Sequence, residues 1–494
     1  MRVFQVLCYH LWRAAKSNDF RTFNHYFSKS VNFLHHLENA TSKDLNLFLY
    51  AIQKFPPKGA NFWTKLQQHL IKNQNILKSF NIMPVMKLFL KHGTYSQEFV
   101  KSIEENPLKS VVNLSTKEFS QFMVCLAKLK KSGVGLDQKL WTILEEKAVS
   151  QKEDLQLSDI SKIIYALGKI RYSKKSFWDI ATKLWIDKIE DLNSAQFADI
   201  YWGYARINKF YRNREAIQML HTHLPEFSKS LKDSHLLMIT YSMMVFNNRD
   251  KVAWENIQNL VLSTLGRMKP DVLIILAYCF SKMELFDPTF FDKFTSRIIL
   301  FMEKYPNKLK FQDIANSAWA IAKYSSIQKN PKIDTGKFWS LLEDQILSYK
   351  QIEIPIETLT TCFWAFKRVN KGSTVLWNRF MELVILQKNK MDLAKLTITL
   401  NVISNHPLDN DDFWKEIEKL TLNLIESNNL NHYYLSKIIR SFGKCKSLST
   451  EQSKAVLKAK FLELYKKEQI TNVNDLVDYV LGFSALSIND PNIW

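Results

Sequence analysis

The chain has 494 residues, with only 11 glycines and 12 prolines, and carries a formal net charge of +20 from 68 Lys and Arg against 48 Asp and Glu. So little glycine disfavours folds that depend on glycine-rich phosphate loops or on many tight strand hairpins. The excess of positive charge favours polyanionic partners, such as nucleic acid or an anionic membrane surface. Membrane insertion is not expected, because no apolar run approaches the roughly 20 residues that a spanning helix needs.

Residues 1–40 form a basic N-terminal segment in which Arg2, Arg13 and Lys16 precede the first acidic residue, Asp19. Its apolar residues fall on one helical face: Val3, Phe4, Leu7, Leu11 and Trp12. Such a basic amphipathic segment is typical of a mitochondrial transit peptide. The alternative is an ordinary set of capping helices at the end of a helical array.

From about Thr41 onward a single helical pattern recurs, here called helix A, as in Leu157–Ile170, Ser194–Ile207 and Phe311–Tyr324. We number its positions backward from its last apolar residue, position zero. Position zero falls at Phe55, His92, Leu129, Ile170, Ile207, Phe246, Met283, Tyr324, Val369, His406, Cys445 and Leu486. Successive copies are 37 to 45 residues apart, a period typical of stacked helical hairpins.

A second helix, helix B, is predicted to begin about seven residues after position zero, often with an aromatic pair such as Phe177-Trp178. Seven tryptophans share this place and are expected in the core between helices: Trp63, Trp141, Trp178, Trp254, Trp339, Trp377 and Trp414. Four residues before zero the side chain is small in ten copies, which predicts close helix packing there: Ala51, Cys125, Ala166, Gly203, Ser242, Cys279, Ala320, Ala365, Ser441 and Gly482.

The repeat predicts an all-α fold, a right-handed α-solenoid of about twelve helical hairpins over residues 41–494 whose last unit is incomplete. Helix starts such as Thr41…Asp44 and Ser115…Glu118 have the residues of a capping box. The cysteines include no CxxC pair and are expected to be small buried side chains in a reducing compartment: Cys8, Cys125, Cys279, Cys362 and Cys445.

The helix A pattern, an acidic residue near the start followed by W/Y-A-x-x-K/R-apolar, resembles the octotricopeptide and heptatricopeptide repeats and the helical part of FAST-kinase-like proteins. Tyr165–Ile170, Trp319–Tyr324 and Trp364–Val369 carry the resemblance best, and it covers roughly Thr41 to Trp494. It implies an organellar RNA-binding factor of RNA processing, stability, translation or ribosome assembly; several such proteins are built into mitochondrial ribosomes. Many members end in a small RAP domain that resembles a nuclease, whereas here the repeats run on to the last residue, so no RNA cleavage is implied.

The residue just before position zero is basic in nine of the twelve copies, and we call this set the cation column. Its members are Lys54, Lys91, Lys128, Lys169, Arg206, Lys282, Lys323, Arg368 and Lys444. Because neighbouring helices in such arrays lie roughly 10 Å apart, the column predicts a row of positive charge that an RNA backbone could follow. The structural alternative is that these residues complement the helix dipole in the last turn.

Four residues earlier, on the same helix face, lies an aromatic column whose members include Tyr165, Trp202, Tyr278, Trp319 and Trp364. A ring beside a cation suits single-stranded RNA, since the ring can stack on a base while the cation meets a phosphate. The alternative is that the rings are core and the lysine stems lie over them.

No catalytic residues, metal ligands or cofactor site are predicted. Ser132–Gly135 lacks the third glycine and the lysine of a phosphate loop. His35-His36 and the pair His221 and His223 lack cysteine or carboxylate partners at metal-ligand spacing.

We therefore expect a non-catalytic RNA-binding protein of the mitochondrial matrix, a structural or assembly component of the mitochondrial ribosome that contacts ribosomal RNA and other ribonucleoprotein subunits. One alternative is a free organellar factor of RNA processing or stability that reads single-stranded RNA. Another is a protein–protein scaffold without direct RNA binding, whose concave face holds an extended peptide. No small-molecule substrate is expected.

Overall fold

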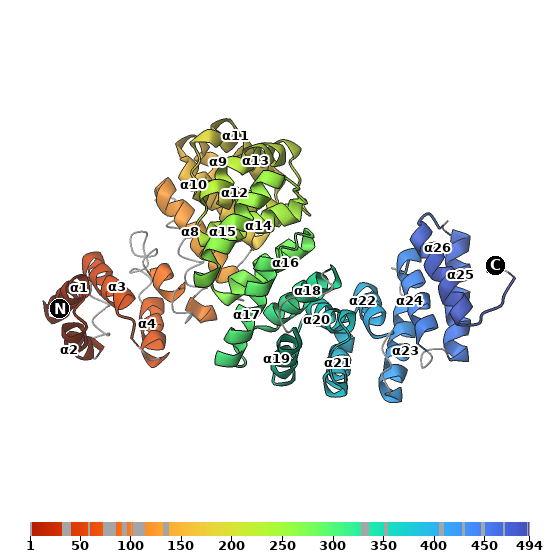
Figure 1. The fold of residues 1–494 in the computed structure, drawn as a ribbon. Coiled ribbons are helices and arrows are strands. Elements are labelled where there is room, and N and C mark those ends of the chain that lie inside the picture. Colours follow the sequence, from red (N-terminus) through yellow and green to blue (C-terminus); the bar gives the residue numbers. More distant parts are fainter. Residues whose placement is uncertain are drawn as a thin grey trace. The chain divides into compact units, whose positions relative to one another are not determined.

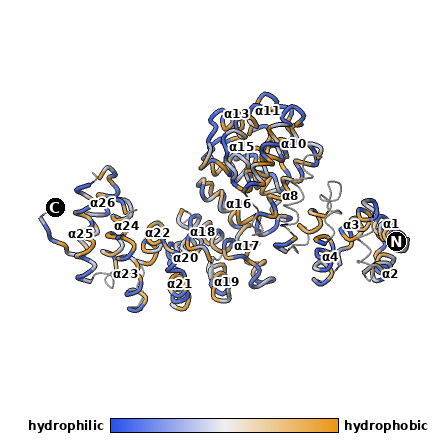
Figure 2. The backbone as a smooth tube through the Cα atoms, turned by 180° about the vertical axis from the view of Figure 1, so that it is seen from behind, coloured by the Kyte–Doolittle hydropathy of each residue, from blue (hydrophilic) through white to orange (hydrophobic). Residues whose placement is uncertain are grey.

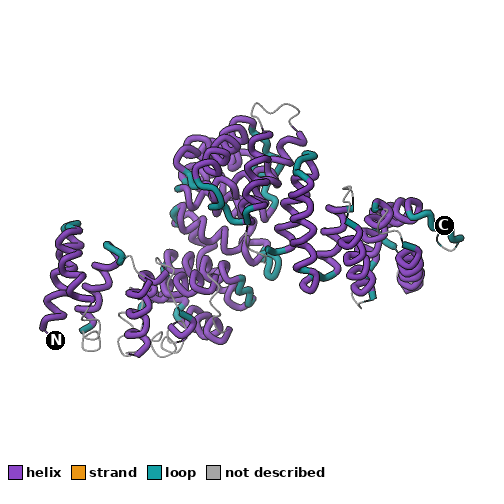
Figure 3. The backbone as a smooth tube through the Cα atoms, turned by 90° about the horizontal axis from the view of Figure 1, so that it is seen from below, coloured by secondary structure: helices purple, strands orange, loops and turns teal. Residues whose placement is uncertain are grey.

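The computed structural model describes residues 2–31, 41–57, 60–72, 85–90, 96–99, 101, 114–131, 138–327, 335–349, 354–404, 410–426, 430–445, 450–467, 470–491 and 493. Within these residues the regular secondary structure is entirely helical, and Figure 3 shows helices joined by loops and turns with no strand. The chain divides into two compact units, unit 1 (Met1–Val261) and unit 2 (Leu262–Trp494), each of which is described by itself below.

Unit 1 has its described helices in two sets. The helices that match helix A, together with the N-terminal one, are α1 (Arg2–Lys16), α3 (Ser42–Lys54), α8 (Thr116–Lys131), α10 (Leu157–Ile170), α12 (Ser194–Ile207) and α14 (Asp233–Phe246). The helices between them are α2 (Phe20–Val31), α4 (Ala60–Lys72), α9 (Gln138–Ser150), α11 (Lys175–Trp185), α13 (Arg214–Phe227) and α15 (Lys251–Thr264), the last of which extends into unit 2. Helix α1 packs on α3, and α8, α10, α12 and α14 pack in series.

Unit 2 repeats this arrangement. Its A helices are α16 (Pro270–Lys282), α18 (Phe311–Ile327), α20 (Ile356–Arg368), α22 (Leu393–Ile403), α24 (His432–Lys444) and α26 (Val473–Ala485). Its B helices are α17 (Pro288–Lys304), α19 (Thr335–Leu347), α21 (Thr374–Leu386), α23 (Asp411–Ile425) and α25 (Glu451–Lys467). Each A helix packs on the next A helix and each B helix on the next B helix, and Figure 1 shows α19, α21 and α23 in a row beside α18, α20 and α22.

Short 3-10 helices follow five of the B helices, at Lys152–Asp154, Ile186–Asp191, Ser228–Ser230, Leu265–Arg267 and Lys388–Lys390. In both units a helix contacts mainly its neighbours in the chain or in its own layer, which is the packing of an α-solenoid. We call the two rows of helices the A layer and the B layer. Figure 2 shows hydrophobic stretches recurring within the helices, whereas many of the connecting turns are hydrophilic.

The core between the layers is built around the B-helix tryptophans. All seven are buried, as predicted from their common place in the repeat. The indole Nε1 of Trp63, Trp178 and Trp254 donates a hydrogen bond to the backbone carbonyl six residues earlier, at 3.2, 2.9 and 2.8 Å. Tryptophan suits this place because its ring fills the core while its N–H ties the start of helix B to the turn before it.

Two further sequence predictions are confirmed at the helix ends and in the core. The Thr41 hydroxyl accepts a hydrogen bond from the Asp44 amide at 3.2 Å, and the Asp44 carboxylate accepts one from the Thr41 amide, which completes a capping box. The five cysteines are buried and unbridged. At the N-terminus, the face of α1 that carries Cys8 and Leu11 is buried, and this helix packs on α2 and α3.

The A helices approach one another through the small residues four positions before zero, all ten of which are buried. A Cβ atom added at Gly203 of α12 would lie 2.5 Å from Cγ2 of Ile164 and 2.8 Å from the carbonyl oxygen of Ile164, both on α10. One added at Gly168 of α10 would lie 2.6 Å from the Cα of Gly203. The predicted close packing is therefore a backbone-to-backbone contact, which only glycine allows at these two positions.

Replacing Gly203 by alanine is expected to destabilise unit 1, because the new methyl group meets the backbone of α10, which cannot yield as a flexible side chain does. The loss in the free energy of unfolding should be about 1–3 kcal/mol, the usual cost of overpacking. Chemical denaturation followed by circular dichroism measures it. Gly266→Ala is the matched control, since an added Cβ at Gly266 meets nothing within 4 Å. Equal stability of the two variants would contradict the close contact.

Candidate nucleic-acid interface

One face of the A layer carries the cation and aromatic columns together. Positions one and five before zero are four residues apart, so their side chains lie one above the other on the same side of the helix. In α10 these are Lys169 and Tyr165, and in α12 they are Arg206 and Trp202. The tight packing of the A helices then brings the columns of successive helices into contact.

In unit 1 the rings of Tyr165 and Trp202 stack on each other, with centroids 4.9 Å apart and an interplanar angle of 28°. The ammonium of Lys169 lies 5.0 Å from the Tyr165 centroid and 6.0 Å from that of Trp202, and it donates a hydrogen bond of 2.9 Å to the Tyr165 hydroxyl. The Arg206 guanidinium lies 5.6 Å from the Trp202 centroid and donates to the hydroxyl of Tyr241 on α14 at 3.3 Å.

Unit 2 repeats this arrangement on α16, α18 and α20. The Lys282 ammonium lies 5.7 Å from the Tyr278 centroid and 4.5 Å from that of Trp319. Lys323, one helix further on, lies 5.7 Å from Trp319 and 5.8 Å from Trp364. Each of these lysines therefore spans the rings of two neighbouring helices, and cation–π attraction helps to hold it there.

We call the cations that follow one another on successive A helices the cation rows: Lys169 and Arg206 in unit 1, and Lys282 and Lys323 in unit 2. The other members of the cation column are placed less regularly. Arg368 of α20 is exposed and donates to the Ser326 hydroxyl on α18 at 3.1 Å. Lys54, Lys128 and Lys444 are exposed at the ends of their helices. The cation column is interrupted in α14, where Val245 takes the place of the cation. Lys91 lies outside the described residues.

The charges in the rows are close enough to affect one another. Burial lowers the pKa of Lys169, and the neighbouring charges of Lys128 and Arg206 lower it further. Burial lowers the pKa of Lys282, and the neighbouring charge of Lys323 lowers it further. Ion pairs among the described residues include those of Lys162, Lys174 and Lys437 with carboxylates. The rows are thus crowded with positive charge and supported by rings and hydroxyls, so they are suited to attract a polyanion.

Eight residues before zero, on the same face, lies a set of charged residues that we did not predict from the sequence. Lys162 of α10 lies 3.8 Å from the Asp159 carboxylate, and in unit 2 Lys437 of α24 pairs with Asp478 of α26. The signal was the helical spacing itself, because this position lies seven residues, or just under two turns, before the cation column. Only some copies of helix A carry a charged residue at this position, so the set was not apparent when the copies were compared.

Two charged residues of the A layer have strongly shifted pKa values. Burial raises the pKa of Asp199 on α12 to about 7, although the charges of Lys162 and Lys128 oppose the shift. Burial and the charge of Lys444 on α24 lower the pKa of Lys367 on α20 to about 8. Lys367 also donates to the Asn401 carbonyl on α22 at 3.1 Å. The charges of Lys128 and Asp199, like those of Lys367 and Lys444, influence each other across one intervening A helix.

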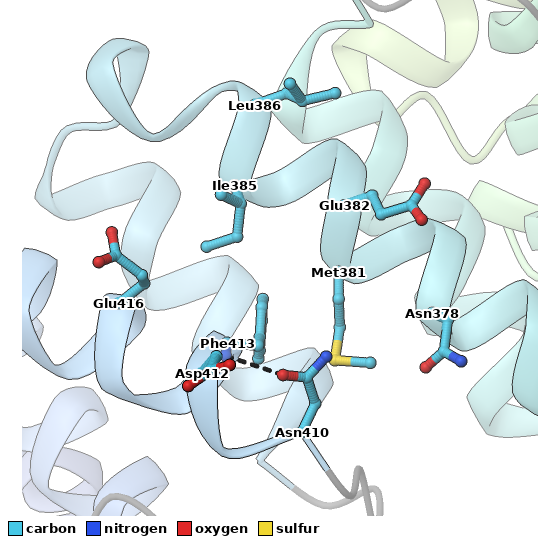
Figure 4. Close-up of a pocket in the computed structure, with 9 residues that line it drawn as sticks. All are labelled: Asn378, Met381, Glu382, Ile385, Leu386, Asn410, Asp412, Phe413 and Glu416. Atoms are coloured by element: carbon cyan, nitrogen blue, oxygen red, sulfur yellow. Dashed lines mark hydrogen bonds between the residues drawn. The ribbon is translucent and has the colours of Figure 1, made fainter.

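An open groove lies elsewhere, between α21 and α23 of the B layer, with a volume of about 700 Å³. Figure 4 shows Met381, Ile385 and Phe413 lying between the two helices, with Glu382 and Glu416 on opposite sides. The groove is apolar within and acidic at its rim, but its acids are already engaged: Glu382 pairs with Arg379 at 2.9 Å and Glu416 with Lys388 at 2.6 Å.

Two negative observations apply to the described residues. No three histidine, cysteine, aspartate or glutamate side chains among them gather as a metal site would require. None of their helices is both long and apolar enough to cross a bilayer.

No protein-family model matches the chain, and no curated protein sequence matches it significantly. Its function is therefore proposed from its own residues and their geometry.

The pKa shift of Asp199 predicts a pH-dependent stability difference. The folded chain holds the Asp199 proton up to about pH 7, whereas the ordinary value is 3.8, so ionisation of this carboxyl costs stability increasingly as pH rises between these values. The gain in melting temperature of Asp199→Asn over the unmodified chain should therefore be larger at pH 8 than at pH 5, as measured by thermal unfolding.

The control is Asp179→Asn, which removes one carboxyl group in the same way. The Asp179 carboxylate accepts a hydrogen bond of 2.6 Å from the Tyr211 hydroxyl, and a neutral amide would accept it more weakly, so the melting temperature should fall. A gain for Asp199→Asn that is the same at both pH values would show that the carboxyl is ionised in the folded chain throughout this range.

Proposed function

We propose that the protein is a non-catalytic RNA-binding protein that holds its RNA along the A-layer cation rows. Architecturally we propose a right-handed α-solenoid of about twelve helical hairpins. The observation that carries the proposal is the alignment of Lys169 with Arg206 in unit 1 and of Lys282 with Lys323 in unit 2, each row crowded with like charge. Phosphates of an RNA backbone would relieve that repulsion and release the counterions that the polymer holds.

The proposed setting is the mitochondrial matrix, with the protein as a structural or assembly component of the mitochondrial ribosome. The basic first helix supports the mitochondrial location. The resemblance of the helix A pattern to the octotricopeptide and heptatricopeptide repeats supports the ribosomal role. Within such a particle the cation rows would hold ribosomal RNA through its backbone while the B layer faces other subunits. A free organellar factor that reads single-stranded RNA uses the same rows and differs in its setting.

The groove between α21 and α23 favours a second candidate, a protein–protein scaffold. Its apolar interior and acidic rim would suit a short amphipathic segment that carries lysine or arginine. We place it second because the acids at its rim are already paired within the chain, whereas the A-layer rows carry a surplus of charge.

Substitution of the row cations tests the proposal directly. Replacing Lys169, Arg206 and Lys323 together by glutamine should weaken binding of generic single-stranded RNA by at least about tenfold near 0.1 M salt, since three phosphate contacts are lost. The slope of log affinity against log salt concentration should fall by about 2, at roughly 0.7 per contact. Fluorescence anisotropy with labelled RNA over a salt series gives both values.

The matched control replaces three exposed lysines of B helices, Lys183, Lys251 and Lys415, which changes the net charge equally. This control should bind like the unmodified chain, and both variants should keep its melting temperature. If the control loses as much affinity as the A-layer variant, net charge rather than the rows explains the binding.

Sedimentation distinguishes a ribosomal component from a free RNA-binding factor. In a sucrose gradient of a native mitochondrial lysate, the protein should sediment with ribosomal particles and move with them when the subunits are separated by removing magnesium. A free factor would stay near the top of the gradient. A salt-resistant complex with one protein partner and no RNA would support the scaffold instead.

A further inference from the structure

The aromatic column was a candidate for stacking on bases, but its rings already contact neighbouring rings and cations. In unit 1 one side of the Trp202 ring faces Tyr165, and the Lys169 and Arg206 cations lie within 6.0 Å of its centroid. In unit 2 Trp319 has neighbours of both kinds: Tyr278 and Trp364 at 5.1 and 6.4 Å, and Lys282 at 4.5 Å.

Burial agrees with these contacts. Only 8% of Trp319 is exposed, and Tyr165, Trp202, Tyr278 and Trp364 are half-buried. A base can stack only on a ring whose face is open over an area close to its own. Access to these faces would require moving the cations off the rings and parting neighbouring rings, which in unit 1 the close contact between α10 and α12 opposes.

We infer that the A-layer rows recognise the phosphate backbone of a nucleic acid and do not read its bases. The rings act as positioning residues: each holds a cation over its ring and so sets the spacing of the row to that of the A helices. The ligand class is a flexible chain of phosphodiesters, whatever its base sequence.

Two details of unit 1 support this assignment. The Tyr165 hydroxyl accepts a hydrogen bond from Lys169, and the Tyr241 hydroxyl accepts one from Arg206. These two hydroxyls are thus directed to the cations of the row, and each uses an acceptor site to position charge. Phosphate contacts position a nucleic acid without carrying sequence information, whereas contacts to base edges would specify it.

This inference rests on the proposed function, and its test distinguishes the two. The full chain is titrated with oligo(U), oligo(A) and oligo(C) of equal length and with inorganic polyphosphate of matched charge. The four affinities should agree within about threefold and fall together with rising salt, because phosphate contacts dominate. Tryptophan fluorescence should change little on binding, since no base stacks on Trp202, Trp319 or Trp364.

Two variants separate a stacking ring from a positioning ring. Trp364→Leu removes a half-buried ring beside Lys323, and Tyr165→Phe keeps the ring but loses the hydroxyl that Lys169 meets. If the rings only position cations, each variant loses the same factor of affinity for all four polymers, including polyphosphate, which has no bases. If bases stack, the loss for Trp364→Leu is greatest on oligo(A) and absent on polyphosphate.

The outcomes are distinct. Binding to oligonucleotides without binding to polyphosphate, a strong preference for one base, or a base-dependent loss in Trp364→Leu overturns the inference and leaves RNA binding in place. Failure to bind any of the four polymers at low salt overturns the proposed function itself. The comparison of polymers on the unmodified chain needs no variant to fold.

Discussion

The backbone contact between successive A helices is the constraint on which the rest of each unit depends. Gly168 and Gly203 touch in unit 1, and in unit 2 a Cβ atom added at Gly443 would lie 2.8 Å from the carbonyl oxygen of Gly482. Helices this close bring the aromatic side chains at one position of the repeat within reach of their counterparts on the next helix. Tyr165 therefore stacks on Trp202, and the Lys169 cation spans both rings. The row of charge is a consequence of how the backbones pack.

Placing these cations side by side lowers the stability of the fold. Lys169 and Lys282 are partly desolvated and lie beside other cations, and the pKa of each is lowered as a result. Elsewhere in the same layer a lysine has a carboxylate partner, as Lys437 has in Asp478. Residues that depart from the locally most stable choice are expected where a protein binds a ligand, which is why we place the ligand at the rows where cations lie beside other cations.

The sequence was sufficient to predict the parts of the fold that repeat. The spacing of position zero predicted helices that end at Ile170 and Ile207, and the shared slots of the tryptophans and of the small residues predicted burial, which the structure confirms. The recurrence of one residue type at one register is a strong signal because each unit packs on a copy of itself.

What the sequence did not reveal depends on contacts between helices. The stacking of Tyr165 on Trp202 and the sharing of Lys282 between two rings require the distance between neighbouring A helices, which periodicity does not give. The shifted pKa of Asp199 arises from its burial among residues of other helices. The division into two units at Val261 also has no counterpart in the repeat pattern, because the spacing of the copies continues through it.

Lysine footprinting tests most directly whether RNA lies along the A layer. The chain is acetylated briefly with and without single-stranded RNA, and the modification of each lysine is measured by mass spectrometry. The proposed interface requires RNA to protect Lys128, Lys282 and Lys444 while exposed lysines of B helices, such as Lys251 and Lys415, react as before. Protection confined to the B layer, or equal protection of both layers, would contradict it.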